Sequence, residues 1–244
     1  MKTILAILFT LIPLFSVRET APITLYLIGD STIAEKLATK RPETGWGEKF
    51  GMFFDSTVRV ANHAKNGRST KSFLAEGLWA PIMDSLRPGD YVFIQFGHND
   101  QSVEKGERYA PPSLFRANLI RYVTETRSKK AIPVLITPVM RRRFTDQGEF
   151  VDMHGEYPDI VRRVARDLDV PFIDLHRKSE ALIKAYGVEG SKQLYLWVRP
   201  GESENYPEGR EDNTHFSPRG AEMMARLVVM GIREADLDLV EHLK

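Results

Sequence analysis

ITLYLIGDST, residues 23–32, is the stretch that decides the fold of this chain. Residues 23–28 form a short apolar run with the composition of a buried strand. Gly29 and the polar residues after it are typical of a tight turn in which Asp, Ser or Thr caps a following helix. The stretch therefore predicts a buried strand whose carboxyl end carries Asp30, Ser31 and Thr32.

Four further short apolar runs predict four more buried strands, at residues 58–61, 91–96, 133–137 and 171–173. Apolar residues recur at helical spacing over 115–123 and 157–168, and Ser217-Pro218 predicts the start of a last helix reaching about residue 234. This alternation predicts an α/β fold over residues 22–244. We expect a single-domain, flavodoxin-like three-layer sandwich with a five-stranded parallel sheet of order 2-1-3-4-5.

Polar residues follow the two strands that flank the topological switch of such a sheet. Residues 29–31 end the first strand, and Gly97-His98-Asn99-Asp100 ends the third. Ligands of open α/β sheets bind in the crevice outside the carboxyl ends of the strands at this switch. The sequence thus predicts that Ser31 and Asn99 share one crevice.

Composition limits the classes of protein to consider. The chain has 244 residues, of which 42% are hydrophobic and 27% charged, which fits one domain with a sizeable core. Its 34 basic and 33 acidic residues give a net charge of +1, too balanced to indicate nucleic acid or an anionic membrane as a partner. Because there is no cysteine, disulfides, a lipidated-cysteine anchor and a thiolate zinc site are excluded.

Residues 1–21 are expected to be a signal peptide. Lys2 precedes an apolar run over 4–15, which has the length of a signal-peptide core and is too short for a transmembrane helix. Cleavage after Ser16 and cleavage after Ala21 both stay open, as does a buried N-terminal strand or helix. The expectation is an exported protein, periplasmic or extracellular, with no membrane span in the mature chain.

Ser31 has the surroundings that a nucleophile requires. At a helix N-terminus, free N–H groups and the helix dipole stabilise a nearby oxyanion. Asp212 and His215, three residues apart on a loop or single turn before the last helix, can supply a base and the carboxylate that orients it. Gly67 and Asn99 can supply oxyanion donors. Each motif alone also has an ordinary structural explanation as a cap, a tight turn or an Asx-turn.

Together these segments resemble the SGNH hydrolase superfamily, with Gly29-Asp30-Ser31, Gly67, Gly97-His98-Asn99-Asp100 and Asp212 with His215 as its four blocks. Within it, GDST (29–32), NHAKNGRS (62–69), FGHND (96–100) and DNTHF (212–216) are similar to the rhamnogalacturonan acetylesterases of pectin breakdown, as are TGWG (44–47) and TPV (137–139). Two features depart from that family. Met140 and the arginines after it look variable, and the disulfides of its fungal members cannot form here.

The resemblance implies a serine esterase that removes acetyl groups from a pectic polysaccharide. Ser31 would be the nucleophile, His215 the base and Asp212 its orienting carboxylate, with the oxyanion held by the N–H groups of Ser31 and Gly67 and the Asn99 amide. This mechanism requires no metal and no cofactor. The partner is an acetylated polysaccharide or oligosaccharide.

Substrate contacts are expected from basic and aromatic residues, because pectin carries galacturonate carboxylates. The candidates are Arg68, Arg141, Arg142 and Arg143, then Trp46, Trp197, Arg199 and Tyr206, the last three on a long connection over 186–212. For the arginines a solvated loop is the alternative, and for Trp46 a place in the core. His98 stays open between oxyanion support, substrate contact and packing.

Three alternative functions keep most of these features. The same catalytic residues could act on acetylxylan or another acetylated glycan, or on a lipid-like ester, although no long apolar run lies near Ser31. The third alternative is a non-catalytic glycan-binding module that keeps the fold of a hydrolase. Complete Ser, Gly, Asn, Asp and His blocks argue against loss of catalysis.

Overall fold

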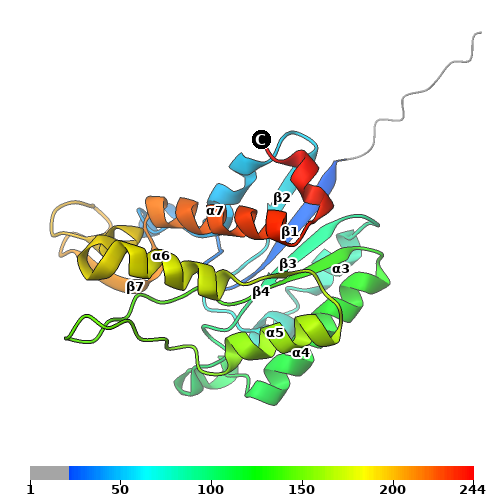
Figure 1. Cartoon of the computed structure of the whole chain (residues 1–244), viewed down its shortest axis with the longest axis horizontal. Helices are drawn as coiled ribbons and strands as arrows, with labels where there is room; N and C mark the ends of the chain where they lie inside the picture. Colours follow the sequence, from blue (N-terminus) through cyan, green and yellow to red (C-terminus); the bar gives the residue numbers. More distant parts are fainter. Residues whose placement is uncertain (1–21) are drawn as a thin grey trace, which may run out of the picture.

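The computed structural model describes residues 22–244 and shows a three-layer α/β sandwich around one parallel sheet (Figure 1). The sheet has the strand order β2-β1-β3-β4-β5, and every adjacent pair is parallel. Its strands are β1 (Ile23–Gly29), β2 (Val58–Asn62), β3 (Tyr91–Gln95), β4 (Ile132–Ile136) and β5 (Phe172–Ile173). Each overlaps an expected strand, so the fold class and the strand order inferred from the sequence are confirmed.

Two layers of helices cover opposite faces of the sheet (Figure 1). One layer holds α1 (Trp46–Phe50), α6 (Leu175–Gly190) and α7 (Pro218–Glu234); the other holds α2 (Thr70–Ala75), α3 (Ala80–Ser85), α4 (Pro112–Ser128) and α5 (Tyr157–Asp167). Successive residues of β1 alternate between the two cores: Leu25 and Leu27 pack toward α7, Tyr26 and Ile28 toward α4. The helices expected over 115–123, 157–168 and 219–234 correspond to α4, α5 and α7.

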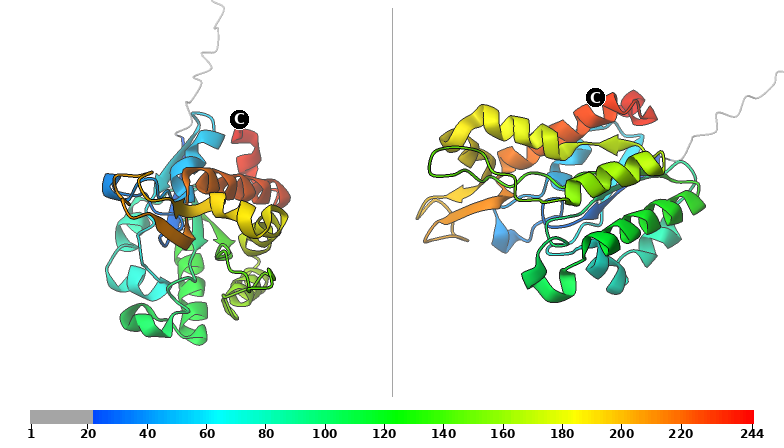
Figure 2. Two further views of the ribbon diagram at one scale, coloured as in Figure 1. Left: turned by 90° about the vertical axis from the view of Figure 1, so that its left-hand side faces the viewer. Right: turned by 60° about the horizontal axis from the view of Figure 1, so that its bottom comes forward.

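A separate antiparallel hairpin lies beside α6 and α7 at one end of the sheet (Figure 2). Its strands are β6 (Tyr195–Val198) and β7 (Arg210–Phe216). The stretch 186–212, expected to be one long connection, therefore contains the end of α6, a short 3-10 helix, β6 and the start of β7. Five short 3-10 helices complete the described chain: η1 (Ala38–Lys40), η2 (Gly51–Phe53), η3 (Val103–Arg108), η4 (Ser191–Leu194) and η5 (Asp238–His242).

Two local expectations have different outcomes. Ser217 caps α7 as expected, since its Oγ accepts a hydrogen bond from the Gly220 N–H at 3.0 Å. After β1, in contrast, the chain makes a single turn and not a helix: the N–H groups of Ile33 and Ala34 both donate to the Asp30 carbonyl, at 3.2 and 3.1 Å. The N–H groups of Thr32, Ile33 and Ala34 are therefore used within this turn, in hydrogen bonds to Asp30.

The expected signal peptide, residues 1–21, lies outside the described residues. Within residues 22–244, none of the helices combines the length and the apolar composition needed to cross a bilayer.

Candidate active site

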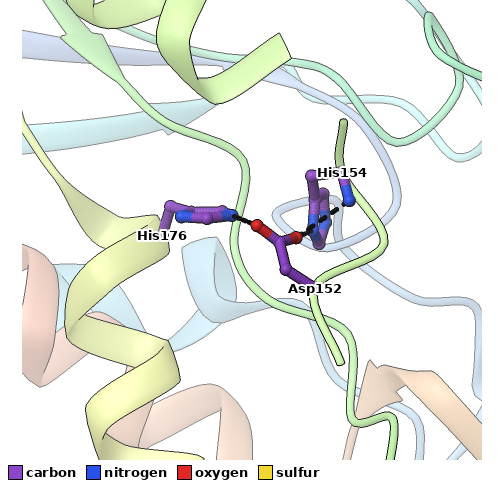
Figure 3. Close-up of side chains that lie close together, drawn as sticks. All are labelled: Asp152, His154 and His176. Atoms are coloured by element: carbon purple, nitrogen blue, oxygen red, sulfur yellow. Dashed lines mark hydrogen bonds and ion pairs between the residues drawn. The ribbon is translucent and has the colours of Figure 1, made fainter. Parts of the chain in front are cut away.

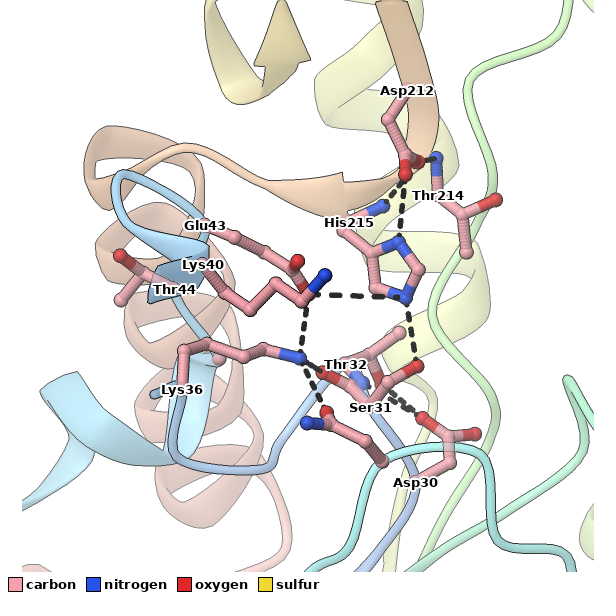
Figure 4. Close-up of polar contacts among 12 residues, drawn as sticks. Asp30, Ser31, Thr32, Lys36, Lys40, Glu43, Thr44, Asp212, Thr214 and His215 are labelled. Atoms are coloured by element: carbon pink, nitrogen blue, oxygen red, sulfur yellow. Dashed lines mark hydrogen bonds and ion pairs between the residues drawn. The ribbon is translucent and has the colours of Figure 1, made fainter. Parts of the chain in front are cut away.

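Ser31, His215 and Asp212 form a continuous hydrogen-bonded chain at the carboxyl edge of the sheet (Figure 4). The Ser31 Oγ lies 2.9 Å from the His215 Nε2, and the His215 Nδ1 lies 2.8 Å from the Asp212 Oδ2. These separations fit a nucleophile, a base and a carboxylate that fixes the tautomer of the base. The structure thus brings together the three residues that the sequence selected as catalytic.

The geometry of Asp212 and His215 comes from an irregularity in the hairpin. Tyr195 pairs with Phe216, but the next residue of β6, Leu196, pairs with Asp212. Residues 213–215 therefore bulge out of the ladder, which turns the histidine back toward the carboxylate. The sequence-based placement of this pair on a loop or turn is wrong, because the pair belongs to β7.

Asp212 is held as a carboxylate by its hydrogen bonds. Besides the imidazole, its Oδ1 accepts the backbone N–H groups of Thr214 at 2.8 Å and His215 at 2.9 Å. Burial raises the pKa of this carboxyl, but the hydrogen bonds and the charge of His215 outweigh burial and lower the pKa. Asp212 is consequently ionised when His215 accepts a proton.

The turn that carries Ser31 is held in place by a series of buried side-chain hydrogen bonds. Thr32 donates to the Asp30 Oδ1 through its N–H at 2.9 Å and its Oγ1 at 2.8 Å. The Gln95 Nε2 donates to the Thr32 Oγ1 at 2.8 Å, and the Trp46 Nε1 donates to the Gln95 Oε1 at 3.0 Å. Trp46 is fully buried. Its expected role as a wall for sugar is therefore wrong, because it supports the nucleophile turn from the core.

Gly67 and Asn99 line the same cleft as Ser31. Gly67 has a φ of +75°, and a Cβ at this position would lie 2.8 Å from an Arg108 Nη1, so another residue would be both strained and crowded. The Asn99 amide nitrogen donates to the Arg68 carbonyl at 2.9 Å, and its Oδ1 accepts from the Lys105 Nζ at 2.8 Å. An amide nitrogen carries two hydrogens, which leaves one for an oxyanion.

The cleft has a volume of about 480 Å³, and its charged lining is mainly basic. Lys40, Lys105, Arg108, Arg141 and Arg210 line it, against the acidic Glu43 and Asp212. Of these basic residues, only Arg141 was predicted from the sequence as a substrate contact. Lys105 and Arg108 could have been found from their positions shortly after the third block, but the ordering of the loop that aims them is a tertiary feature.

Of the other expected substrate contacts, some line the cleft and some do not. Tyr206 lines the cleft with Arg141. Arg68 does not line the cleft, because its guanidinium forms an ion pair with Glu76 at 2.6 Å.

Arg142 and Trp197 do not line the catalytic cleft, because both side chains bind Asn213. The guanidinium donates to the Asn213 Oδ1 at 2.8 Å, and the indole N–H donates to the same oxygen at 3.0 Å. Arg142 is buried, and it also donates to the Ser191 Oγ and the Val188 carbonyl. These two side chains stabilise the bulge that carries Asp212.

His98 lines the cleft but is nearly fully buried. Its Nε2 lies 2.7 Å from the Val139 carbonyl, which can only accept, so Nε2 carries the proton. Burial holds the pKa of His98 well below its ordinary value, with the nearby Arg141 acting in the same direction. His98 therefore meets the cleft as a neutral imidazole and not as a cation.

A second cluster, Asp152 with His154 and His176, has the side chains of a metal site (Figure 3). Asp152 accepts the His154 N–H at 2.9 Å and lies 3.0 Å from both imidazoles. The Arg162 Nη2, which can only donate, lies 3.3 Å from the His176 Nδ1. The contact between the His176 Nε2 and the Asp152 Oδ2 is a close ion-pair approach without the geometry of a hydrogen bond. Through these contacts Asp152 links His154, in the segment after β4, to His176 on α6.

A parallel α/β sheet with a Ser–His–Asp chain at its carboxyl edge defines a serine hydrolase that acts by acyl transfer. The chain belongs to the GDSL-like lipase/acylhydrolase family, whose sequence model matches residues 27–223. This match confirms the resemblance to the SGNH hydrolases.

Several relatives match nearly the whole chain. Rhamnogalacturonan acetylesterase RhgT of Bacillus subtilis is 47% identical over 91% of this chain and 94% of its own length. The probable rhamnogalacturonan acetylesterase YesY of the same organism is 36% identical over 90% and 96%. The crystal structure of YxiM, also from Bacillus subtilis, superposes with a TM-score of 0.75 at 25% identity, over 89% of this chain and 58% of that longer chain.

Proposed function

We propose that this protein removes O-acetyl groups from rhamnogalacturonan, a pectic polysaccharide, through an acetyl-enzyme intermediate. The observation that carries the proposal is the Ser31–His215–Asp212 chain opening into a cleft whose charged lining is mainly basic. Similarity to two proteins named as rhamnogalacturonan acetylesterases supports the same substrate.

The reaction begins when the Ser31 Oγ attacks the acetyl carbonyl carbon while the His215 Nε2 takes the hydroxyl proton. The carbonyl π-electrons move to oxygen, and this oxyanion accepts hydrogen bonds from the N–H groups of Ser31 and Gly67 and from the Asn99 amide. When the tetrahedral intermediate collapses, the C–O bond to the sugar breaks and His215 returns the proton to the leaving hydroxyl. Water then repeats the sequence on the acetyl-enzyme and releases acetate and free Ser31.

The basic lining fits a polyanionic substrate. Arg108 and Arg141 both line the cleft: Arg108 lies beside Gly67, and the Arg141 Nη2 donates to the His98 carbonyl at 3.0 Å. Guanidinium groups form strong, directional hydrogen bonds with carboxylates, such as those of galacturonate. These two residues would hold the galacturonate units that flank an acetylated sugar.

The substrate is tested by acetate release from acetylated rhamnogalacturonan, acetylxylan and a long-chain acyl ester, with Ser31→Ala as the control. The proposal expects the highest kcat/KM on acetylated rhamnogalacturonan. It also expects added salt to raise KM for this polyanion but not for neutral acetylxylan, because salt screens the arginine–carboxylate attraction. A preference for acetylxylan, or salt-independent KM values on both glycans, would contradict it.

We also propose that the enzyme works outside the cytoplasm after removal of residues 1–21. The apolar run behind Lys2 supports this. The N-terminal residue of protein recovered from the culture medium or the periplasm tests it: an N-terminus close to residue 17 or 22 is expected, and retention of Met1 in the cell would contradict export.

A further inference from the structure

The Lys36 ammonium is buried beside the nucleophile and contacts three oxygen atoms, two through hydrogen bonds and one in an ion pair (Figure 4). Its side chain is 1% exposed, and its Nζ lies 2.5 Å from the Ser31 carbonyl, 2.7 Å from the Asn66 Oδ1 and 2.7 Å from the Glu43 Oε1. Two of its hydrogens are donated, to the Ser31 carbonyl and the Asn66 amide oxygen, and the Glu43 carboxylate balances its charge. A buried cation is tolerated only with such pairing.

The three residues that Lys36 contacts come from three separate segments of the site. Ser31 belongs to the nucleophile turn, and Asn66 precedes Gly67 in the oxyanion loop. Glu43 belongs to the segment between η1 and α1. One side chain therefore sets the spacing between the attacking oxygen and an oxyanion donor.

Glu43 faces the base as well as Lys36. Its Oε1 lies 4.0 Å from the His215 Nε2, the atom that takes the Ser31 proton. The backbone fixes this approach, because the N–H of the next residue, Thr44, donates to the Phe216 carbonyl at 3.0 Å. Glu43 would thus add a second negative charge beside His215 if Lys36 did not neutralise it.

We propose that Lys36 is a positioning residue for acyl transfer: it ties the nucleophile turn to the oxyanion loop and neutralises Glu43 beside the base. The inference rests on the roles of Ser31 and His215 in the proposed function and not on the identity of the sugar. No direct contact between Lys36 and substrate is required.

Other charged or titratable groups also face His215, and all of them stay in place when Lys36 or Glu43 is changed. They are Asp212 on β7, Asp30 after β1, His98 after β3, and Arg210 and Arg141, which act on His215 through Asp212. A difference between the pH profiles of these variants and the wild type is therefore caused by the loss of the Lys36–Glu43 ion pair.

The test measures kcat, KM and the pH profile of kcat/KM with 4-nitrophenyl acetate, a small ester that needs no sugar site. Lys36→Met should lower kcat about tenfold or more, leave KM nearly unchanged and move the acidic limb about one pH unit upward, because unpaired Glu43 favours protonated His215. Glu43→Gln should move the same limb downward, because the Lys36 charge is then unpaired. The double variant Lys36→Met/Glu43→Gln should return the limb to its wild-type position without restoring kcat.

Two further variants keep the test decisive. Lys178→Met breaks the ion pair with Glu234 on the outside of α6 and α7, and should leave kcat and the limb unchanged. Lys36→Arg keeps the charge and should keep the limb. If thermal unfolding shows that Lys36→Met does not fold, the test depends on Glu43→Gln alone. A downward shift of its acidic limb then supports the proposal, and an unshifted limb contradicts it.

Acidic limbs that superimpose on the wild type in both Lys36→Met and Glu43→Gln would overturn the proposal, as would equal losses of kcat in Lys36→Met and Lys178→Met. Failure of the proposed function would give different results in these assays. Loss of the sugar preference leaves 4-nitrophenyl acetate hydrolysis intact, whereas an active Ser31→Ala would remove the nucleophile itself.

Discussion

Asp100→Asn should make the free energy of unfolding less dependent on pH. Asp100 is fully buried; its Oδ1 accepts the Thr70 N–H at 2.8 Å and the Thr70 Oγ1 at 2.5 Å, while its Oδ2 has no hydrogen-bond partner within residues 22–244. Burial, reinforced by the nearby charge of Asp30 and opposed by the Thr70 hydrogen bonds, raises the pKa of Asp100 from 3.8 to about 7.

The sign of the effect follows from that raised pKa. Above pH 3.8 the carboxyl ionises in the unfolded chain, but in the folded chain it keeps its proton until about pH 7. Ionisation therefore favours the unfolded chain, and the native protein loses stability as the pH rises through this window. The interval of 3.2 pH units between the two values corresponds to at most about 4 kcal/mol. Asparagine cannot ionise and escapes this loss.

Urea unfolding at pH 4, 6 and 8 and constant ionic strength measures the effect. The free energy of unfolding of Asp100→Asn minus that of the wild type should increase with pH, by up to about 4 kcal/mol between pH 4 and 8. Asp146→Asn, at an exposed position, is the matched control and should show a constant difference. A constant difference for Asp100→Asn as well would refute the inference that Asp100 is protonated in the folded protein.

Three further substitutions test the site. Asn99→Ala should lower kcat about 10²–10³-fold with little change in KM, because it removes one oxyanion donor; an equal rise in KM would assign the amide to substrate binding. Asp212→Asn should lower kcat at pH 7 about 10⁴-fold by stabilising the wrong tautomer of His215, and wild-type turnover would contradict that role. Arg142→Met should lower the free energy of unfolding by about 2–4 kcal/mol through its lost bonds near Asn213, and an unchanged midpoint in urea would show that these bonds add nothing.

The parallel sheet could be predicted because each of its strands is a short apolar run between helical patterns. The hairpin could not, since β7 has the sequence REDNTHF, without the alternation of a half-buried strand. Its pairing depends instead on Tyr195 and Leu196 and on the side chains behind the bulge.

The catalytic residues could be selected because they fall in short motifs at the ends of strands. Arg141 and Tyr206 were also predicted correctly to line the cleft. Most other residues around the site could not be predicted, because their environment is set by contacts distant in sequence. Trp46 and Arg142 have sequence contexts that suit sugar binding, yet they are buried against Gln95 and Asn213. Lys36 is an ordinary lysine in the sequence, and only the folded chain places it between Ser31 and Glu43.

The site of covalent modification by a serine-directed phosphonate tests the central claim most directly. Tandem mass spectrometry of the labelled protein should place one phosphonyl group on Ser31, with loss of esterase activity in proportion to labelling. Ser31→Ala should remain unlabelled and inactive. Labelling at another serine, or full activity in Ser31→Ala, would contradict the assignment of Ser31 as the nucleophile.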